Sequence, residues 1–188
     1  MLVMLMPVCY YTAGSKLLHR RFRPQKGGII VAKPILGLQE PGFKFVNPQP
    51  LMVTGNDIDM FCNASGMRED IFLSDESAKA MGMKARVAPG PLHLALMLGC
   101  LVKEDLLVDC VYLGTDKMKV LHPLYPGDSI RAELEMRSTK PTSKGDMIIF
   151  NYSWALKNQN DETTAQGENT CAVMKTARTV HGFQSRGM

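Results

Sequence analysis

The chain has no long apolar run and no closely spaced cysteines. Its longest uninterrupted apolar stretch, Leu94 to Val102, is nine residues, whereas a membrane span needs about 20. The five cysteines are odd in number and lie at least ten residues apart, so there is no CxxC motif. This pattern disfavours a membrane span, a zinc site and a disulfide framework. We therefore expect free thiols, no metal site and no cofactor.

The chain also lacks the basic balance of a nucleic-acid-binding domain. Its net charge is +4, but residues 1–48 carry seven Lys or Arg against one Glu, whereas residues 49–188 carry 15 basic against 17 acidic side chains. The basic character therefore belongs to the N-terminal part, and the remainder is slightly acidic. Because phosphate binding needs a basic face, nucleic acid is not expected as the main ligand.

The length and composition indicate one globular domain. The chain has 188 residues, of which 45% are hydrophobic and 21% charged, close to the globular average. The apolar start, Met1 to Val8, precedes a basic cluster, which is the reverse of the charge order in a secretory signal. We expect a cytoplasmic protein with a basic N-terminal extension and arm over 1–48, a folded domain over 49–178 and a tail over 179–188.

Helix signals cluster in the first half of the domain. Pro89-Gly90-Pro91 predicts the start of a main helix that ends near Asp105, since proline suits the first helical turn. This helix is apolar on every side over 94–102, so other elements should wrap it. A shorter helix is expected from Asn56 or Asp57 to Ser65, and another over 75–81. The residues between these two short helices are expected to form a loop.

Four strand-like segments follow the main helix. They cover 110–121, 129–137, 147–156 and 163–175, and the breaks between them contain turn-forming residues. One buried helix followed by a run of antiparallel strands predicts an α+β fold in which a curved sheet wraps the helix.

Three short motifs carry a resemblance to a known family. They are Val53–Ile58 leading to Ser65-Gly66, then Ala85–Leu92, and then His122–Asp128. Their order and spacing resemble the MaoC-like branch of the hotdog fold, which includes (R)-specific enoyl-CoA hydratases and 3-hydroxyacyl dehydratases. The resemblance covers residues 50–175 and implies a single hotdog built around a helix at 91–105.

The family's catalytic signature is only partly present. Ser65, Gly66, Ile71 and Ala78 match it without a gap. The residues that normally activate and deliver water are replaced by apolar ones. In this chain Met67 stands in place of the signature's Asp, Glu69 in place of its Asn, Asp70 in place of its Pro and Phe72 in place of its His.

The resemblance implies an acyl-thioester site at the start of the main helix. The amide of Gly90 would bind the thioester oxygen, aided by the helix dipole. Ser65, Gly66, Met67 and Phe72 would line the substrate site. The alternative is that Gly90 only permits the turn before the helix.

Proton transfer needs other groups, because Met67 and Phe72 cannot supply it. Adjacent Glu69 and Asp70 are candidates to share acid–base work. The alternative is a solvated pair, or a pair bound to Arg68. His93, in the first turn of the main helix, is a third catalytic candidate and should be neutral there.

Three functions stay open at this stage. The first is a hydratase or dehydratase of enoyl- or 3-hydroxyacyl-thioesters, presented on CoA or on a carrier protein. The second is a non-catalytic hotdog subunit that holds the acyl chain for a catalytic partner. The third is an acyl-CoA thioesterase, since hotdog folds also host that reaction. In each case we expect a homodimer, or a heterodimer with another hotdog subunit.

Overall fold

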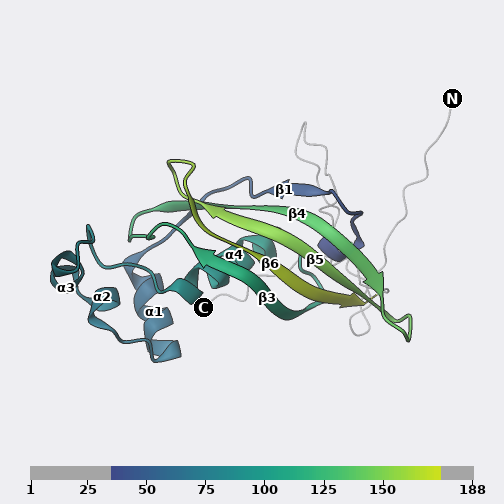
Figure 1. The fold of residues 1–188 in the computed structure, drawn as a ribbon, viewed down its shortest axis with the longest axis horizontal. Helices are drawn as coiled ribbons and strands as arrows, with labels where there is room; N and C mark the ends of the chain where they lie inside the picture. Colours follow the sequence, from purple (N-terminus) through teal and green to yellow (C-terminus); the bar gives the residue numbers. More distant parts are fainter. Residues whose placement is uncertain (1–34, 175–188) are drawn as a thin grey trace, which may run out of the picture. The chain divides into compact units, whose positions relative to one another are not determined.

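The computed structural model describes residues 35–174. These residues form an antiparallel sheet of six strands with one long helix and several short ones (Figure 1). The first 34 residues of the extension and arm predicted over 1–48, and the whole tail predicted over 179–188, lie outside the described residues. The elements in chain order are η1 (Leu36–Leu38), β1 (Lys44–Val46), β2 (Leu51–Met52), α1 (Gly55–Ser65), α2 (Asp70–Leu73), α3 (Asp75–Ala80), α4 (Gly90–Lys103), β3 (Cys110–Val120), β4 (Ser129–Pro141), β5 (Met147–Lys157) and β6 (Thr163–Met174).

The sheet has the order β1-β4-β5-β6-β3, and β2 pairs separately with β4. Side chains along β4 and β5 alternate between buried and partly exposed, as expected for a sheet with one face on the core. The helix α4 contacts β4 and β6, and Figure 1 shows it behind the strands. This arrangement confirms the predicted α+β fold, with a curved antiparallel sheet against a central helix.

The central helix α4 is buried along one side and partly exposed along the other. Leu92, His93 and Met97 are buried on the side that faces the sheet. Ala95 and Val102, however, are exposed, and Val102 retains 60% of its accessible surface. The described residues therefore cover most of this helix but leave Ala95 and Val102 exposed.

The short helices differ from the expectation in two details. The N-cap of α1 is Thr54, not Asn56 or Asp57: Thr54 Oγ1 accepts from the Asp57 N–H at 3.2 Å, and Asp57 Oδ2 accepts from the Thr54 N–H at 2.7 Å. This reciprocal pair is a capping box. The segment expected as a loop also contains α2, which begins at Asp70. Gly66 ends α1 in the left-handed region, with a φ of 77°.

Residues 35–48, which the sequence placed in the N-terminal arm, contribute to the core and the sheet. Leu36 is fully buried, and β1 pairs with β4 through Phe45 and Leu134. The four cysteines in the described part are free thiols. None of the helices described for 35–174 is long and apolar enough to cross a membrane.

Candidate functional site

The three motifs that carry the family resemblance are joined by main-chain hydrogen bonds. The Val53 N–H donates to the Asp128 carbonyl at 2.8 Å, and the Gly127 N–H donates to the Val53 carbonyl at 2.7 Å. The Ala88 N–H donates to the Leu124 carbonyl at 2.8 Å. The first motif, the segment before α4 and the turn before β4 therefore meet at one place, although up to 75 residues (53 to 128) separate them in sequence.

The start of α4 presents a backbone donor. Gly90 is the first helical residue, and the following Pro91 has no N–H. The next amide, at Leu92, donates to the Pro89 carbonyl at 2.9 Å. Within residues 35–174 the Gly90 N–H has no recorded acceptor. The positive end of this 14-residue helix therefore carries a backbone donor that has no acceptor among the described residues.

Gly90 lies beside the edge strand β3. A Cβ atom added at Gly90 would lie 3.5 Å from Val120 Cγ2, an ordinary van der Waals contact. Alanine would therefore fit at this position. The helix start and the last residue of β3 are neighbours, so anything docked against this end of β3 would also be close to Gly90.

His93 is buried in the first turn of α4, with 1% of its surface exposed. Its Nδ1 lies 3.4 Å from the Pro89 carbonyl oxygen, whereas its Nε2 has no hydrogen-bond partner among the described residues. Burial lowers the pKa of His93, and nearby backbone carbonyls of Pro89, Gly90 and His122 only partly oppose this effect. The imidazole is therefore neutral at pH 7, as expected for a buried histidine at a helix N-terminus.

Arg86 ties the segment before α4 to α1. Its Nη1 lies 2.5 Å from Asp59 Oδ1 and its Nη2 lies 3.3 Å from Asp59 Oδ2. A Cβ added at Gly55 would lie 2.4 Å from Arg86 Nη2, so glycine leaves the space that the guanidinium occupies. The hydrogen bond from Arg86 lowers the pKa of Asp59, and the same bond raises the pKa of Arg86. Sequence reasoning missed this pair, because nothing in the pattern links two residues 27 positions apart.

The segment that carries the altered signature is polar on its surface and apolar beneath. Ser65 is exposed, and its Oγ donates to the Phe61 carbonyl at 2.7 Å. Met67 and Phe72 are half-buried, and Phe72 packs against the hydrophobic core. Ile71 in α2 accepts a hydrogen bond from the Val87 N–H at 3.2 Å, so this segment lies against the residues that lead to Gly90.

The two candidate carboxylates lie outside these contacts. Glu69 and Asp70 are exposed, and neither side chain has a hydrogen-bond or ion-pair partner in the part of the chain that the structure describes. Arg68, the expected alternative partner, donates instead to Asn63 Oδ1 at 2.7 Å. No recorded contact joins either carboxylate to Gly90 or His93.

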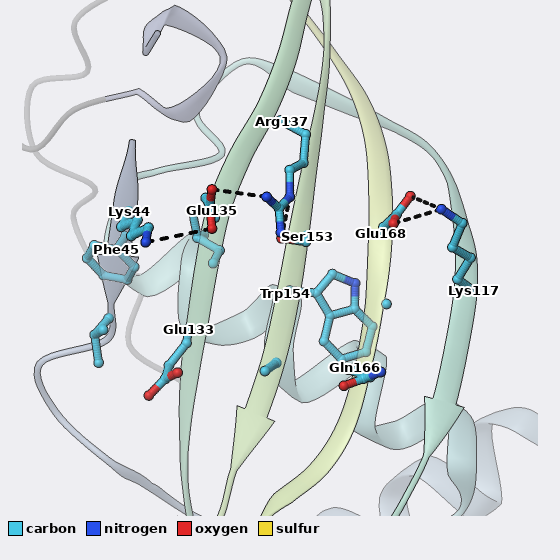
Figure 2. Close-up of a pocket in the computed structure, with 14 residues that line it drawn as sticks. Lys44, Phe45, Lys117, Glu133, Glu135, Arg137, Ser153, Trp154, Gln166 and Glu168 are labelled. Carbon is cyan, nitrogen blue, oxygen red and sulfur yellow. Dashed lines mark hydrogen bonds and ion pairs between the residues drawn. The ribbon is translucent and has the colours of Figure 1, made fainter. Parts of the chain in front are cut away.

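A shallow hollow of about 500 Å³ lies elsewhere, over the face of the sheet that points away from α4 (Figure 2). Arg137 donates to Glu135 and Ser153, both at 3.0 Å, and Lys117 lies 2.9 Å from Glu168. Because the hollow's basic and acidic side chains pair with one another, it presents no uncompensated charge to a ligand. No group of three metal-ligating side chains occurs among residues 35–174.

Comparison with solved structures identifies the architecture. A MaoC-like dehydratase from Rhodospirillum rubrum superposes with a TM-score of 0.65 at 20% identity, over 74% of this chain and 96% of that one. An (R)-hydratase from A. caviae involved in PHA biosynthesis gives 0.60 at 18% identity, over 73% and 98%. HadBC, a (3R)-hydroxyacyl-ACP dehydratase complex from Mycobacterium tuberculosis, gives 0.63 at 20% identity, over 73% and 99%. The chain has the MaoC-like hotdog fold.

No protein-family model and no curated protein matches the chain. The segment before α4 and the Gly90 N–H belong to the residues that the sequence resemblance singled out.

Proposed function

We propose that this protein is a MaoC-like acyl-thioester-binding subunit that recognises enoyl or 3-hydroxyacyl groups through the Gly90 amide. The observation that carries the proposal is the Gly90 N–H at the start of α4, which has no acceptor among the described residues. A thioester carbonyl needs one or two fixed donors, and a helix N-terminus supplies both a donor and a favourable dipole. Glycine also lets the ligand approach the backbone closely.

We propose further that the chain does not hydrate its ligand unaided. Hydration of an enoyl thioester needs a base for water and an acid for the α-carbon. Met67 and Phe72 have no titratable group, and the Glu69 and Asp70 side chains are exposed, without contacts that would aim them at a ligand. A hotdog partner that carries the family's Asp and His would supply these groups.

The partner would dock on the edge strand β3, which pairs with β6 and with no other strand in the described part of the chain. This strand exposes several apolar side chains, and α4 exposes Val102 nearby in sequence. A long, apolar, unpaired edge is normally covered in a stable protein. Pairing there would bring partner residues next to Gly90, beside Val120. The exposed apolar residues of this region are Val111, Tyr112, Leu113, Val120 and Leu121.

One observation favours a second candidate, an active hydratase. His93 is buried in the first turn of α4, and its Nε2 is without a partner among the described residues. A neutral imidazole at that position is suited to accept a proton from water. The chain would then be active as a homodimer, and His93→Asn would abolish hydration without preventing binding.

Titration with crotonyl-CoA tests the binding proposal, using calorimetry on the purified full-length chain. Gly90→Pro removes the N–H but keeps a residue that suits the first helical turn, whereas Gly90→Ala keeps the N–H and adds a methyl group that fits. We expect Gly90→Pro to weaken binding about 3- to 10-fold, the range for one lost hydrogen bond. Gly90→Ala should bind within about twofold of the wild type.

The same samples separate the two candidates. Loss of enoyl absorbance reports hydration, and thiol release reports thioester hydrolysis. Binding without either reaction supports the acyl-holding subunit, and hydration that disappears in His93→Asn supports the second candidate. Equal affinity in wild type and Gly90→Pro would contradict the role of the Gly90 amide.

A further inference from the structure

The residues that lead into α4 are held by three different elements at three successive positions. The Arg86 N–H donates to Asp75 Oδ1 at 2.9 Å, at the start of α3. The Val87 N–H donates to Ile71 in α2, and the Ala88 N–H donates to Leu124 in the turn before β4. We call residues 85–89 the strap. Because its amides are fixed one after another, the direction of the next free amide, at Gly90, depends on the position of the strap.

The side chain of Arg86 extends this attachment to α1. Its guanidinium binds both carboxylate oxygens of Asp59, and it rests over Gly55 at the start of the helix. The Arg86 side chain is only 19% exposed, whereas that of Asp59 is 44% exposed. A planar guanidinium bound through two nitrogens fixes orientation as well as distance, which a lysine ammonium does not.

We propose that the Arg86–Asp59 pair is a positioning pair for ligand recognition: it holds the strap so that the Gly90 N–H is aimed at the thioester carbonyl. This inference rests on the proposed function, in which that amide binds the carbonyl. Arg86 lies four residues before Gly90. Its side chain binds Asp59 in α1, and its backbone amide binds Asp75 in α3. The pair would act on the ligand through the backbone, without touching it. A preorganised donor loses much of its value when its direction is free to vary.

The test uses two ligands that differ only in the carbonyl group. Butyryl-CoA is a thioester, and S-butyl-CoA is the matching thioether without the oxygen. The ratio of their dissociation constants measures carbonyl recognition alone. Any general loss of folding, or any lost attraction between Arg86 and the phosphates of CoA, affects both ligands equally and leaves the ratio unchanged. Titrations are made on the full chain, well below the melting temperature of each variant.

We expect the wild type to prefer the thioester, and Gly90→Pro to lose that preference. Arg86→Met and Asp59→Asn should reduce the preference about threefold or more, with the affinity for the thioether unchanged. Arg86→Lys keeps the charge but loses the planar guanidinium, so its preference for the thioester should lie between those of the wild type and Arg86→Met. Arg137→Met is the matched control, since it removes an arginine ion pair on the outer face of the sheet, and its ratio should equal that of the wild type.

A double variant tests whether Arg86 changes the thioester preference through the Gly90 amide. If Arg86 acts through Gly90, then Arg86→Met should cause no further loss of preference in a Gly90→Pro background. A preference retained in folded Arg86→Met and Asp59→Asn, but lost in Gly90→Pro, would overturn the positioning role and leave the proposed function intact. A wild type that binds both ligands equally would overturn the proposed function, and the positioning role with it.

Discussion

The start of α4 and the segment that carries the altered signature, residues 65–72, adjoin each other but are built differently. The strap before α4 is fixed by successive hydrogen bonds and by the Arg86–Asp59 pair. The 65–72 segment presents Glu69 and Asp70 to solvent without partners among the described residues. Under the proposed function, the features that would bind a carbonyl are held in fixed geometry, whereas the carboxylates that could transfer a proton are not. The proposal therefore separates binding from catalysis within one hotdog.

The largest effect on activity is expected from restoring the acid–base pair. Replacing Met67 by Asp and Phe72 by His together should produce measurable hydration of crotonyl-CoA, because positioned general acids and bases contribute about 10²- to 10⁴-fold each. The measurement is loss of enoyl absorbance by the purified variant beside the wild type. Phe72 packs against the core, so the melting temperature of the variant is recorded first. Hydration by the wild type at a comparable rate would contradict the proposal.

A charged residue on the edge strand β3 should weaken the pairing of two copies of this chain, which is the homodimer expected where no other hotdog subunit takes part. Leu113 is 54% exposed on the edge strand, so Leu113→Glu should leave the fold of the single chain intact. We expect the dimer dissociation constant to rise at least about tenfold, as measured by analytical ultracentrifugation. Met60→Glu, at a residue 62% exposed on α1, is the control and should leave the constant unchanged. A wild type that is monomeric at all concentrations would contradict the edge as a self-pairing surface.

The elements that could be predicted from sequence are those with long, regular patterns. The helix expected over 91–105 is observed over 90–103, and the four long strands begin at the residues expected. A continuous apolar helix and alternating strands leave few other ways to bury their surfaces. The sequence did not predict the single turn of α2 or the capping of α1 by Thr54, because short helices depend on local hydrogen bonds more than on pattern.

The candidate residues could be named from sequence, but the contacts between them could not be predicted. The resemblance indicated Gly90, and the structure gives it a free amide beside Val120. The Arg86–Asp59 pair could not be predicted, since its two residues belong to different motifs and only the fold brings them together. Whether Glu69 and Asp70 contact the rest of the site is likewise a matter of side-chain direction, which no spacing rule provides.

The buried histidine of α4 should give the protein a pH dependence that its exposed carboxylates do not explain. Burial lowers the pKa of His93 in the folded state below its unfolded value of about 6.5. Between these two values unfolding takes up a proton, so stability falls as the pH falls below about 6.5. The contribution is at most about 1.4 kcal/mol per pH unit. Urea unfolding of the wild type and His93→Asn between pH 7 and pH 5 should show a flatter profile for the variant. Parallel profiles would show that His93 is not the titrating group.

The smallest effects on stability and affinity are expected at the two exposed carboxylates, Glu69 and Asp70. Near-zero effects follow from the contrast between the two regions. Glu69→Gln and Asp70→Asn remove charge with little change in shape, and neither breaks a recorded ion pair or hydrogen bond. Asp70 is the first residue of α2, so its loss should reduce the unfolding free energy by no more than about 0.5 kcal/mol through the weakened helix dipole interaction. Affinity for crotonyl-CoA should stay within about twofold of the wild type for both variants. A loss of affinity or of any hydration rate beyond that range would place these carboxylates in the site. Glu69 and Asp70 would then supply the proton transfer, and the 65–72 segment would still contain the groups needed for catalysis.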